Sequence, residues 1–459
     1  MKYTVRVLLI IFSFLLATSW IHAEETIPFD PFGKVAVLQT GQNPSRLVIV
    51  LSGVEGWKGE VVEIAHKLAN PESLVLGIDY NSYVEGTKDD RFLCPCGDFA
   101  KISQYMEKQH TFKQYVPPIL IGNAEGGQVV YAMMAESPNT FLGGISLNFC
   151  PTSELSHRMC KGYGFEHGRG KNLDNFLPAT NLKDPWMAIG AGGTRGCTVR
   201  QVRAFVEQVT NGSYREPSSD VITDVLASSA KMQQRTITVL NTNLGLPLIE
   251  LPSKGTQDTL VVILSGDGGW ISLDRDIANY LSEQGFSIVG FDLLRYLWRG
   301  QTPDQGSKDL EKIVSYYLNT WKKKQALLIG YSMGADALPF MVSRLSDDAK
   351  KQIKGAVLLG PALRSDFGLN ITADDDQGPS NGDALMPEVR KMTVPVLCIG
   401  GSIEKESLCR RIANSEEKIN GLDVELLHAN HTFRDDYQNL CSLISDKFSL
   451  HLPPPQTQQ

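Results

Sequence analysis

The sequence lacks the features of a membrane-spanning or nucleic-acid-binding protein. The apolar run near its N-terminus, Val7 to Leu16, is shorter than the roughly 20 residues that a spanning helix needs. No cysteine follows that run at once, which argues against a lipid anchor. The formal net charge of −7 argues against binding nucleic acid through bulk electrostatics, and no nucleic-acid partner is expected.

The N-terminus instead has the pattern of a secretory signal peptide. Lys2 and Arg6 provide the charged region, the apolar run follows, and a small residue, Ala23, ends the segment. We therefore predict an exported protein with a signal peptide at 1–23, cleaved near Ala23. An uncleaved membrane anchor is the alternative.

The chain has eight cysteines, and an oxidising exported compartment favours pairing of some of them. They are Cys94, Cys96, Cys150, Cys160, Cys197, Cys398, Cys409 and Cys441. Spacing does not determine which cysteines pair. The spacing of Cys94-Pro95-Cys96 is too tight for the usual zinc knuckle and no histidine follows closely, so no metal site is predicted.

An internal repeat divides the chain. The apolar segment Leu47–Gly53 recurs as Leu260–Gly266, and each reads as a buried parallel strand. Other landmarks recur in the same order: Trp57 and Trp270, Gly77–Asp79 and Gly290–Asp292, Gly122–Gly126 and Gly330–Gly334. The repeat predicts two α/β units, at 24–240 and 241–459, joined between Ala230 and Thr256.

A G-x-S-x-G pentapeptide, Gly330-Tyr331-Ser332-Met333-Gly334, lies in the second unit. An apolar strand precedes it and a helical pattern follows, which is the context of a nucleophile elbow. We therefore predict two tandem α/β-hydrolase-like domains. Ser332 is the predicted nucleophile of the C-terminal one.

A serine nucleophile needs a base and an acid later in the chain. His431 is the favoured base because His431-Thr432-Phe433 fits the usual H-x-F context, with His428 as the alternative. His451 lies in the proline-rich tail. Glu404 is the favoured acid because it stands three residues after Gly401; Glu406 is the alternative and Asp366 a third choice.

An oxyanion hole needs two backbone N–H groups. We expect one from Met333 and the other from Asp267 or Gly268, in the glycine-rich turn after the first long strand of this unit. This chemistry requires no cofactor.

The first unit lacks all three catalytic roles. Ala124 stands at the nucleophile position, and the strand Trp186–Gly190 leads into Ala191–Arg195 without a carboxylate. No histidine occurs between His167 and the joint. We expect a degenerate, non-catalytic domain that serves as a lid, a binding platform or a docking surface.

At these residues the chain resembles the bacterial VirJ/AcvB virulence-protein family of periplasmic α/β-hydrolases. The matching segments are Leu264–Trp270, Arg295–Trp298 with Thr302-Pro303, Gly330–Asp336 with Leu338-Pro339, and His431–Tyr437. The two-unit length is similar to that of the long AcvB-type members. Ala429-Asn430-His431-Thr432 departs from the Gly-Gly-His-His usual in the family.

The resemblance implies hydrolysis of aminoacyl-phosphatidylglycerol, chiefly the lysyl form, at the periplasmic face of the membrane. It also implies a role in virulence and contact with type IV secretion proteins. Arg295, Trp298, Arg299 and Asp336 are then candidates for substrate binding. The two arginines could hold a lipid phosphate. The alternative for the segment 295–299 is an amphipathic stretch that packs within the protein. A generic periplasmic carboxylesterase or thioesterase is the alternative enzyme, and an interaction module of a secretion system is the alternative of another class.

Overall fold

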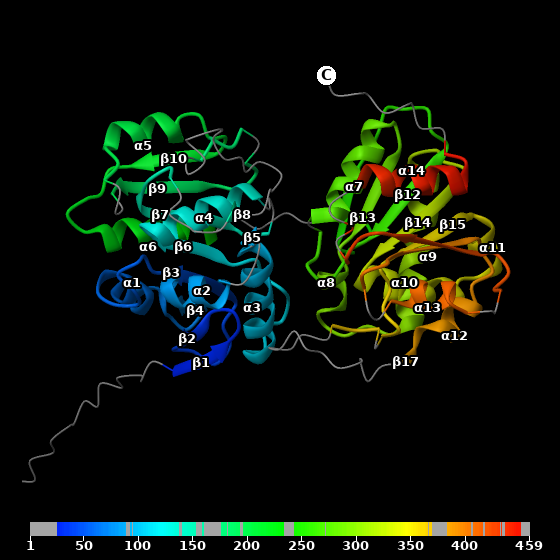
Figure 1. The fold of residues 1–459 in the computed structure, drawn as a ribbon, viewed down its shortest axis with the longest axis horizontal. Helices are drawn as coiled ribbons and strands as arrows, with labels where there is room; N and C mark the ends of the chain where they lie inside the picture. The colour runs from blue at the N-terminus through cyan, green and yellow to red at the C-terminus, as the bar shows by residue number, and fades with distance from the viewer. Residues whose placement is uncertain are drawn as a thin grey trace, which may run out of the picture.

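The computed structural model describes most of the chain beyond the predicted signal peptide. The described residues are 25–88, 92–93, 95–136, 140–152, 158–159, 176–180, 182–192, 196–233, 243–270, 272–365, 367–369, 383–404, 407–415, 418–431, 433 and 437–450. They form two α/β units, each built on one large sheet (Figure 1). The predicted α/β fold class is thus confirmed. Residues 1–23 lie outside the description, so export stays a prediction.

The first unit contains an eight-stranded sheet in the order β1-β2-β4-β3-β6-β7-β9-β10. Its strands are β1 (Glu25–Phe29), β2 (Gly33–Leu38), β3 (Arg46–Leu51), β4 (Ser73–Ile78), β6 (Ile119–Asn123), β7 (Gly143–Phe149), β9 (Trp186–Ala191) and β10 (Gly212–Arg215). Its helices are α1 (Glu60–Leu68), α2 (Tyr80–Gly86), α3 (Pro95–Gln109), α4 (Glu125–Glu136), α5 (Val199–Val206) and α6 (Val221–Gln233). The short strands β5 (Phe92–Leu93) and β8 (Arg158–Met159) pair outside the main sheet.

The second unit contains a seven-stranded sheet in the order β11-β13-β12-β14-β15-β18-β19. Its strands are β11 (Leu248–Leu251), β12 (Thr259–Leu264), β13 (Ser287–Phe291), β14 (Gln325–Tyr331), β15 (Ile353–Leu359), β18 (Val396–Gly401) and β19 (Leu422–Leu427). Its helices are α7 (Ser272–Glu283), α8 (Leu293–Leu297), α9 (Pro303–Thr320), α10 (Met333–Ser343), α11 (Asp347–Lys351), α12 (Leu385–Arg390), α13 (Leu408–Ala413) and α14 (Tyr437–Phe448). A small ribbon pairs β16 (Arg364–Ser365) with β17 (Asp383–Ala384).

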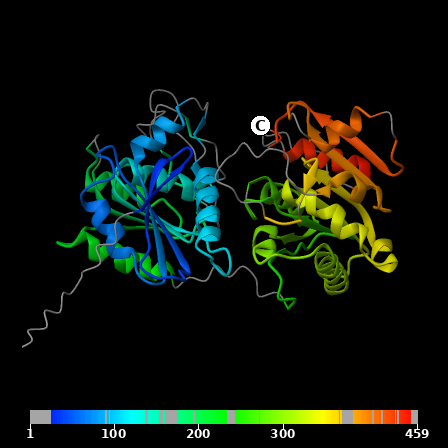
Figure 2. The ribbon, with the colours of Figure 1, turned by 90° about the horizontal axis from the view of Figure 1, so that it is seen from below.

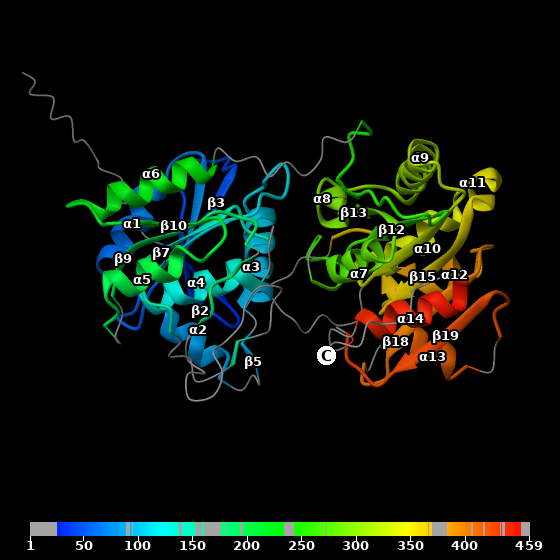
Figure 3. The ribbon, with the colours of Figure 1, turned by 90° about the horizontal axis from the view of Figure 1, so that it is seen from above.

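The apolar strands explain why helices cover both faces of each sheet. Along β12, Leu260, Val262 and Leu264 join one core cluster, whereas Val261 and Ile263 join the cluster on the opposite face. A continuous apolar run therefore buries both faces, which is typical of parallel strands. Figure 2 and Figure 3 show helices on both sides of each sheet.

The two units repeat one another in detail. Without β1, the two strand orders correspond strand for strand. Among the described strands of these two orders, β2 and β11 are the ones that run antiparallel to their neighbours. In each unit a tryptophan ring packs against a strand glycine that has no room for a side chain, Trp57 on Gly77 and Trp270 on Gly290. The sequence landmarks of the repeat thus have the same structural role in both units.

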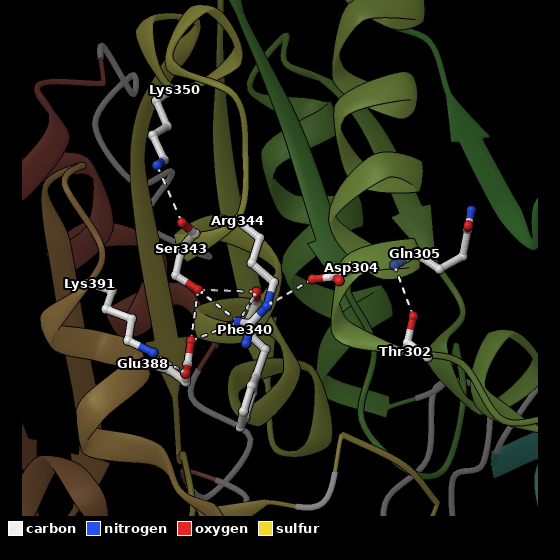
Figure 4. Close-up of polar contacts among 9 residues, drawn as sticks. All are labelled: Thr302, Asp304, Gln305, Phe340, Ser343, Arg344, Lys350, Glu388 and Lys391. Carbon is white, nitrogen blue, oxygen red and sulfur yellow. Dashed lines mark hydrogen bonds and ion pairs between the residues drawn. The ribbon is translucent and has the colours of Figure 1, made fainter.

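An ion-pair network fixes the far end of helix α10. Arg344, the C-cap residue of α10, bonds the carboxylate of Glu388 on α12 at 2.7 Å and that of Asp304 on α9 at 3.2 Å (Figure 4). Lys391 also bonds Glu388, at 2.7 Å. Burial raises the pKa of Glu388, but its bonds to Lys391 and Arg344 outweigh burial and leave the pKa below its usual value.

Replacing Arg344 with methionine should destabilise the second unit. The change leaves the carboxylate of Glu388, whose side chain is only 10% exposed, without one of its two cationic partners. We expect a loss of about 1–3 kcal/mol in the free energy of unfolding, measured by urea denaturation at pH 7. The control is Lys351→Met, because the Lys351–Asp348 pair is exposed and such pairs contribute little. Equal effects of both changes would contradict a structural role for the network.

Candidate active site

The residue at the centre of the candidate site, Ser332, lies in a sharp turn between β14 and α10. Its backbone has φ 51° and ψ −119°, a strained conformation for a residue with a side chain. A side chain at Gly334 would collide with the carbonyl oxygen of Leu264 on β12, and one at Gly330 with the carbonyl oxygen of Gly334. The two glycines therefore allow α10 to pack closely on the sheet while the turn forms.

The structure brings Ser332, His431 and Glu404 together in a hydrogen-bonded series. His431 Nε2 lies 2.9 Å from Ser332 Oγ, and His431 Nδ1 lies 2.6 Å from Glu404 Oε1. Glu404 follows β18 and His431 follows β19, so both stand beyond the carboxyl ends of neighbouring parallel strands. This arrangement can remove a proton from the serine hydroxyl while the glutamate orients the imidazole.

Neighbouring groups hold the His431 ring in this orientation. The Tyr331 ring stacks on it, with centroids 5.5 Å apart, and Gly360 leaves room beside it, since a Cβ there would lie 3.1 Å from the ring. The hydrogen bond that Glu404 accepts from His431 Nδ1 raises the pKa of His431, partly opposed by burial. The imidazolium that forms on proton transfer is thereby stabilised.

Glu404 is itself fixed by its own loop. Its Oε2 accepts a hydrogen bond from the Gly401 amide at 3.1 Å, and its carbonyl oxygen accepts one from Arg410 at 2.9 Å. A disulfide between Cys398 on β18 and Cys409 on α13 closes the loop that contains Glu404. The two hydrogen bonds and the disulfide thus restrain both the carboxylate and the backbone of Glu404.

The alternative residues differ in where they lie. His428 is exposed on the loop after β19, and Ser332 is bonded to His431 instead. Glu406, Asp366 and His451 lie outside the described residues.

The turn predicted for the oxyanion hole lies next to Ser332. A Cβ placed on Gly266 would be 3.5 Å from Ser332 Cβ, and the Gly269 amide closes the turn onto the Gly266 carbonyl at 3.1 Å. Asp267 and Gly268 form the middle of this turn, and Met333 is the first residue of α10. Asp274 accepts a hydrogen bond from the Gly266 amide at 3.3 Å and so restrains the start of the turn.

Three of the residues predicted to bind substrate make contacts within the protein. Trp298 and Arg299 contact the first unit, and Arg295 contacts a residue of its own unit. Trp298 is buried, and its Nε1 donates to the Phe112 carbonyl at 3.0 Å. Arg299 donates to the Lys113 carbonyl at 3.0 Å. Arg295 bonds Asp292 at 2.5 Å. These contacts engage the side chains that were expected to hold a lipid phosphate.

Asp336, the fourth predicted substrate residue, lies one helical turn beyond Ser332. It accepts a hydrogen bond from the Ala362 amide at 2.7 Å. Burial raises the pKa of Asp336 to about 7, against the opposing effect of that bond and of His431. The structure thus places it near the histidine, with a structural contact of its own.

The first unit has the same sharp turn at Ala124, but a side chain occupies the place that corresponds to the predicted oxyanion hole. Ala124 has φ 50°, nearly the same as Ser332. The next residue, Glu125, is buried and its Oε2 accepts a hydrogen bond from the Val54 amide at 3.1 Å. Val54 follows Gly53 as Asp267 follows Gly266. A carboxylate therefore stands where an oxyanion would bind, a feature that sequence reasoning missed although Glu125 aligns with Met333.

Removing the Cys398–Cys409 disulfide should impair turnover more than binding. The double variant Cys398→Ala with Cys409→Ala frees the loop that carries Glu404, and a small displacement of a catalytic group costs roughly 10-fold or more in rate. The measurement is kcat and KM for a chromogenic ester, at a temperature where the variant is folded. The matched control removes the Cys150–Cys197 disulfide of the first unit by the same substitutions. A loss of kcat as large in that control would contradict a specific effect on Glu404.

Comparisons with solved structures return α/β proteins of low similarity. A lipase-esterase related protein from Clostridium acetobutylicum is 14% identical, with 44% of this chain and 98% of that chain covered, at a TM-score of 0.34. Est1E from Butyrivibrio proteoclasticus with bound ferulic acid is 14% identical, covering 43% and 92%, at 0.33. Naproxen esterase from Bacillus subtilis is 13% identical, covering 44% and 86%, at 0.32. No curated protein matches the sequence.

Within the described residues, no helix has both the length and the apolar character that a membrane span requires.

The family model described as bacterial virulence protein (VirJ) matches residues 258–451, which include β12, the turn at Gly266, Ser332, Glu404 and His431. The second unit of this chain is thus similar to the VirJ family of bacterial virulence proteins over residues 258–451.

Proposed function

We propose that the protein is a serine hydrolase that cleaves a carboxylic ester in its second unit. The observation that carries the proposal is the series Ser332 Oγ, His431 and Glu404, joined at 2.9 and 2.6 Å. Three side chains from three separate loops meet in the order that activates a serine. The strained backbone of Ser332 supports the same role, since strain of this kind is typical of functional turns.

The proposed mechanism follows from the geometry. His431 takes the proton of Ser332 as Oγ attacks the ester carbonyl carbon, and Glu404 stabilises the imidazolium. The backbone amides of Met333 and Asp267 bind the oxyanion of the tetrahedral intermediate. His431 then donates its proton to the leaving alcohol, and a water molecule releases the acyl group from Ser332 by the same steps in reverse.

For the substrate, we propose the aminoacyl ester of a phosphatidylglycerol, chiefly the lysyl form, met at the periplasmic face of the membrane. The family resemblance supports this choice. The charges of the site favour a cationic acyl group as well, because the exposed carboxylate of Asp267 acts electrostatically to raise the pKa of His431. Such a carboxylate can accept the ammonium group of an aminoacyl ester. A role in virulence and contact with secretion proteins are part of the same proposal.

Ser332→Ala should reduce ester hydrolysis by roughly 10³-fold or more, because the triad then lacks its nucleophile. The measurement is release of amino acid from lysyl-phosphatidylglycerol vesicles, beside hydrolysis of short p-nitrophenyl esters. His428→Ala is the matched control, and it should keep most of the activity because His428 is exposed and Ser332 bonds to His431.

The outcomes separate the candidate functions. Turnover that survives Ser332→Ala would exclude the serine mechanism. Hydrolysis of p-nitrophenyl esters with no action on the aminoacyl lipid would favour a generic carboxylesterase or thioesterase. Full rescue of a deletion strain by the Ser332→Ala variant would favour an interaction module.

Glu404→Gln should shift the pH dependence of kcat/KM to lower pH. His431 acts as a base only when neutral, so activity falls as the pH drops through its pKa, which Glu404 raises. Without the charge of Glu404 that pKa falls, and the acid side of the profile moves down in pH while the maximum rate falls by roughly 10³-fold. The measurement is a pH–rate profile on a p-nitrophenyl ester. An unmoved acid side would mean that Glu404 does not act on His431.

A further inference from the structure

Helix α3 of the first unit packs directly against the second unit. It lies on the side of the first unit that faces α8 in Figure 1 and Figure 3. Lys108 near its end donates to the Trp298 carbonyl at 2.5 Å, and its ammonium lies 4.3 Å from the centroid of the Trp298 ring. Leu294 on α8 and Trp298 just after α8 belong to the hydrophobic core of the first unit. The contact is therefore a packed interface between the two units.

The chain just after α3 completes this contact. The Tyr115 ring lies 5.5 Å from that of Trp298, between centroids, and the carbonyls of Phe112 and Lys113 accept bonds from Trp298 and Arg299. An indole whose N–H is bonded and whose ring is enclosed contributes both apolar burial and orientation. Trp298 thus acts as the anchor that fixes α3 relative to the second unit.

One helical turn before Lys108, on the same face of α3, stands Gln104. Its side chain is buried, and its Nε2 donates a hydrogen bond to the Asp267 carbonyl at 3.2 Å. Asp267 is the residue whose amide is the proposed second donor of the oxyanion hole. A side chain of the first unit thus bonds the turn on which the active site of the second unit depends.

We propose that Gln104 is a positioning residue for the oxyanion hole, so that the first unit, which we expect to be non-catalytic, helps to build the active site of the second. The proposal rests on the proposed function, because it needs Asp267 to act as an oxyanion donor. Gln104 does not touch the substrate. It acts through Asp267, whose carbonyl it holds.

The turn needs such support for a physical reason. Gly266, Gly268 and Gly269 flank Asp267, and glycine gives a turn many accessible conformations. An oxyanion hole stabilises the transition state only if its donors are already in place, because reorienting them during the reaction costs free energy. Asp274 holds the turn at Gly266 and the Gly269 amide closes it, which leaves the peptide after Asp267 to be fixed by Gln104.

The first unit shows how the same turn is held without a partner. There the carboxylate of Glu125 accepts the hydrogen bond from the Val54 amide and fixes the turn from within. In the second unit Met333 replaces that glutamate, since the amide of Asp267 must stay open to substrate. Gln104 bonds the Asp267 carbonyl, which belongs to the peptide with Gly268, so it restrains Asp267 while the amide of Asp267, in the preceding peptide, stays available.

The test compares Gln104→Leu with Lys108→Met in the full-length protein. Gln104→Leu keeps the size of the side chain but removes its donor, and we expect kcat to fall by roughly 10–100-fold with KM changed less than about twofold. Lys108→Met removes a bond to the same interface but none to the turn, so kcat should change less than about threefold. Urea midpoints and the fraction labelled by a fluorophosphonate confirm folding and an intact serine.

Two further readouts separate positioning from general stability. The affinity of Gln104→Leu for a boronate transition-state analogue should fall in parallel with kcat/KM. Gln104→Glu can donate to the Asp267 carbonyl only when its new carboxyl group is protonated, so its rate relative to wild type should rise as the pH falls. A structural defect alone would produce neither effect.

The proposal is overturned if Gln104→Leu keeps kcat within about twofold of wild type while Ser332→Ala is inactive. It is also overturned if Lys108→Met lowers kcat as much as Gln104→Leu, because docking of the units and not the bond to Asp267 would then set the rate. If Ser332→Ala retains turnover, the proposed function itself fails, whatever the Gln104 variants do.

Discussion

Ser332, Glu404 and His431 meet because the strands before them run parallel and end at one edge of a single sheet. β14, β15, β18 and β19 are successive parallel neighbours, with a register shift between β14 and β15 at Ala326–Leu327, and Gly401 on β18 pairs with Leu427 on β19. Three residues beyond Gly401 and four beyond Leu427 then bring a carboxylate and an imidazole within 2.6 Å. A shift of one residue in the register of β19 would reverse the side-chain directions and separate the pair.

Local patterns explain how much of this site could be predicted from the sequence. The glycines around Ser332, the spacing of Glu404 from Gly401 and the context of His431 each reflect a short-range requirement of the fold, and the structure brings these three residues together. The disulfides could not be assigned in this way. Among the described residues Cys398 pairs with Cys409 and Cys150 with Cys197, and the second pair is 47 residues apart in sequence, a separation that spacing alone does not determine.

The sequence did not predict the contacts between the two units, because these depend on how the units pack against each other. Arg295, Trp298 and Arg299 have the composition of a lipid-binding segment, basic and aromatic, and the same chemistry suits a packed interface. Trp298 is buried against α3, a contact between residues some 186 positions apart in the chain. Gln104 stands in an ordinary amphipathic helix, and no feature of its neighbours in the sequence distinguishes it.

The two copies of the glycine turn show how one fold supports two different roles. An open amide beside a strained elbow attracts negative charge, and in the first unit the carboxylate of Glu125 satisfies it permanently. That bond stabilises the turn, and the same carboxylate would repel a developing oxyanion, so stability and catalysis make opposite demands on one position. In the second unit the position is Met333, the amide of Asp267 has no acceptor within the part of the chain that the structure describes, and the restraint comes from Gln104 of the other copy. If the proposed function holds, the first unit, which has Ala124 where the second has Ser332, still contributes to catalysis, because it supplies the restraint on Asp267 across the interface.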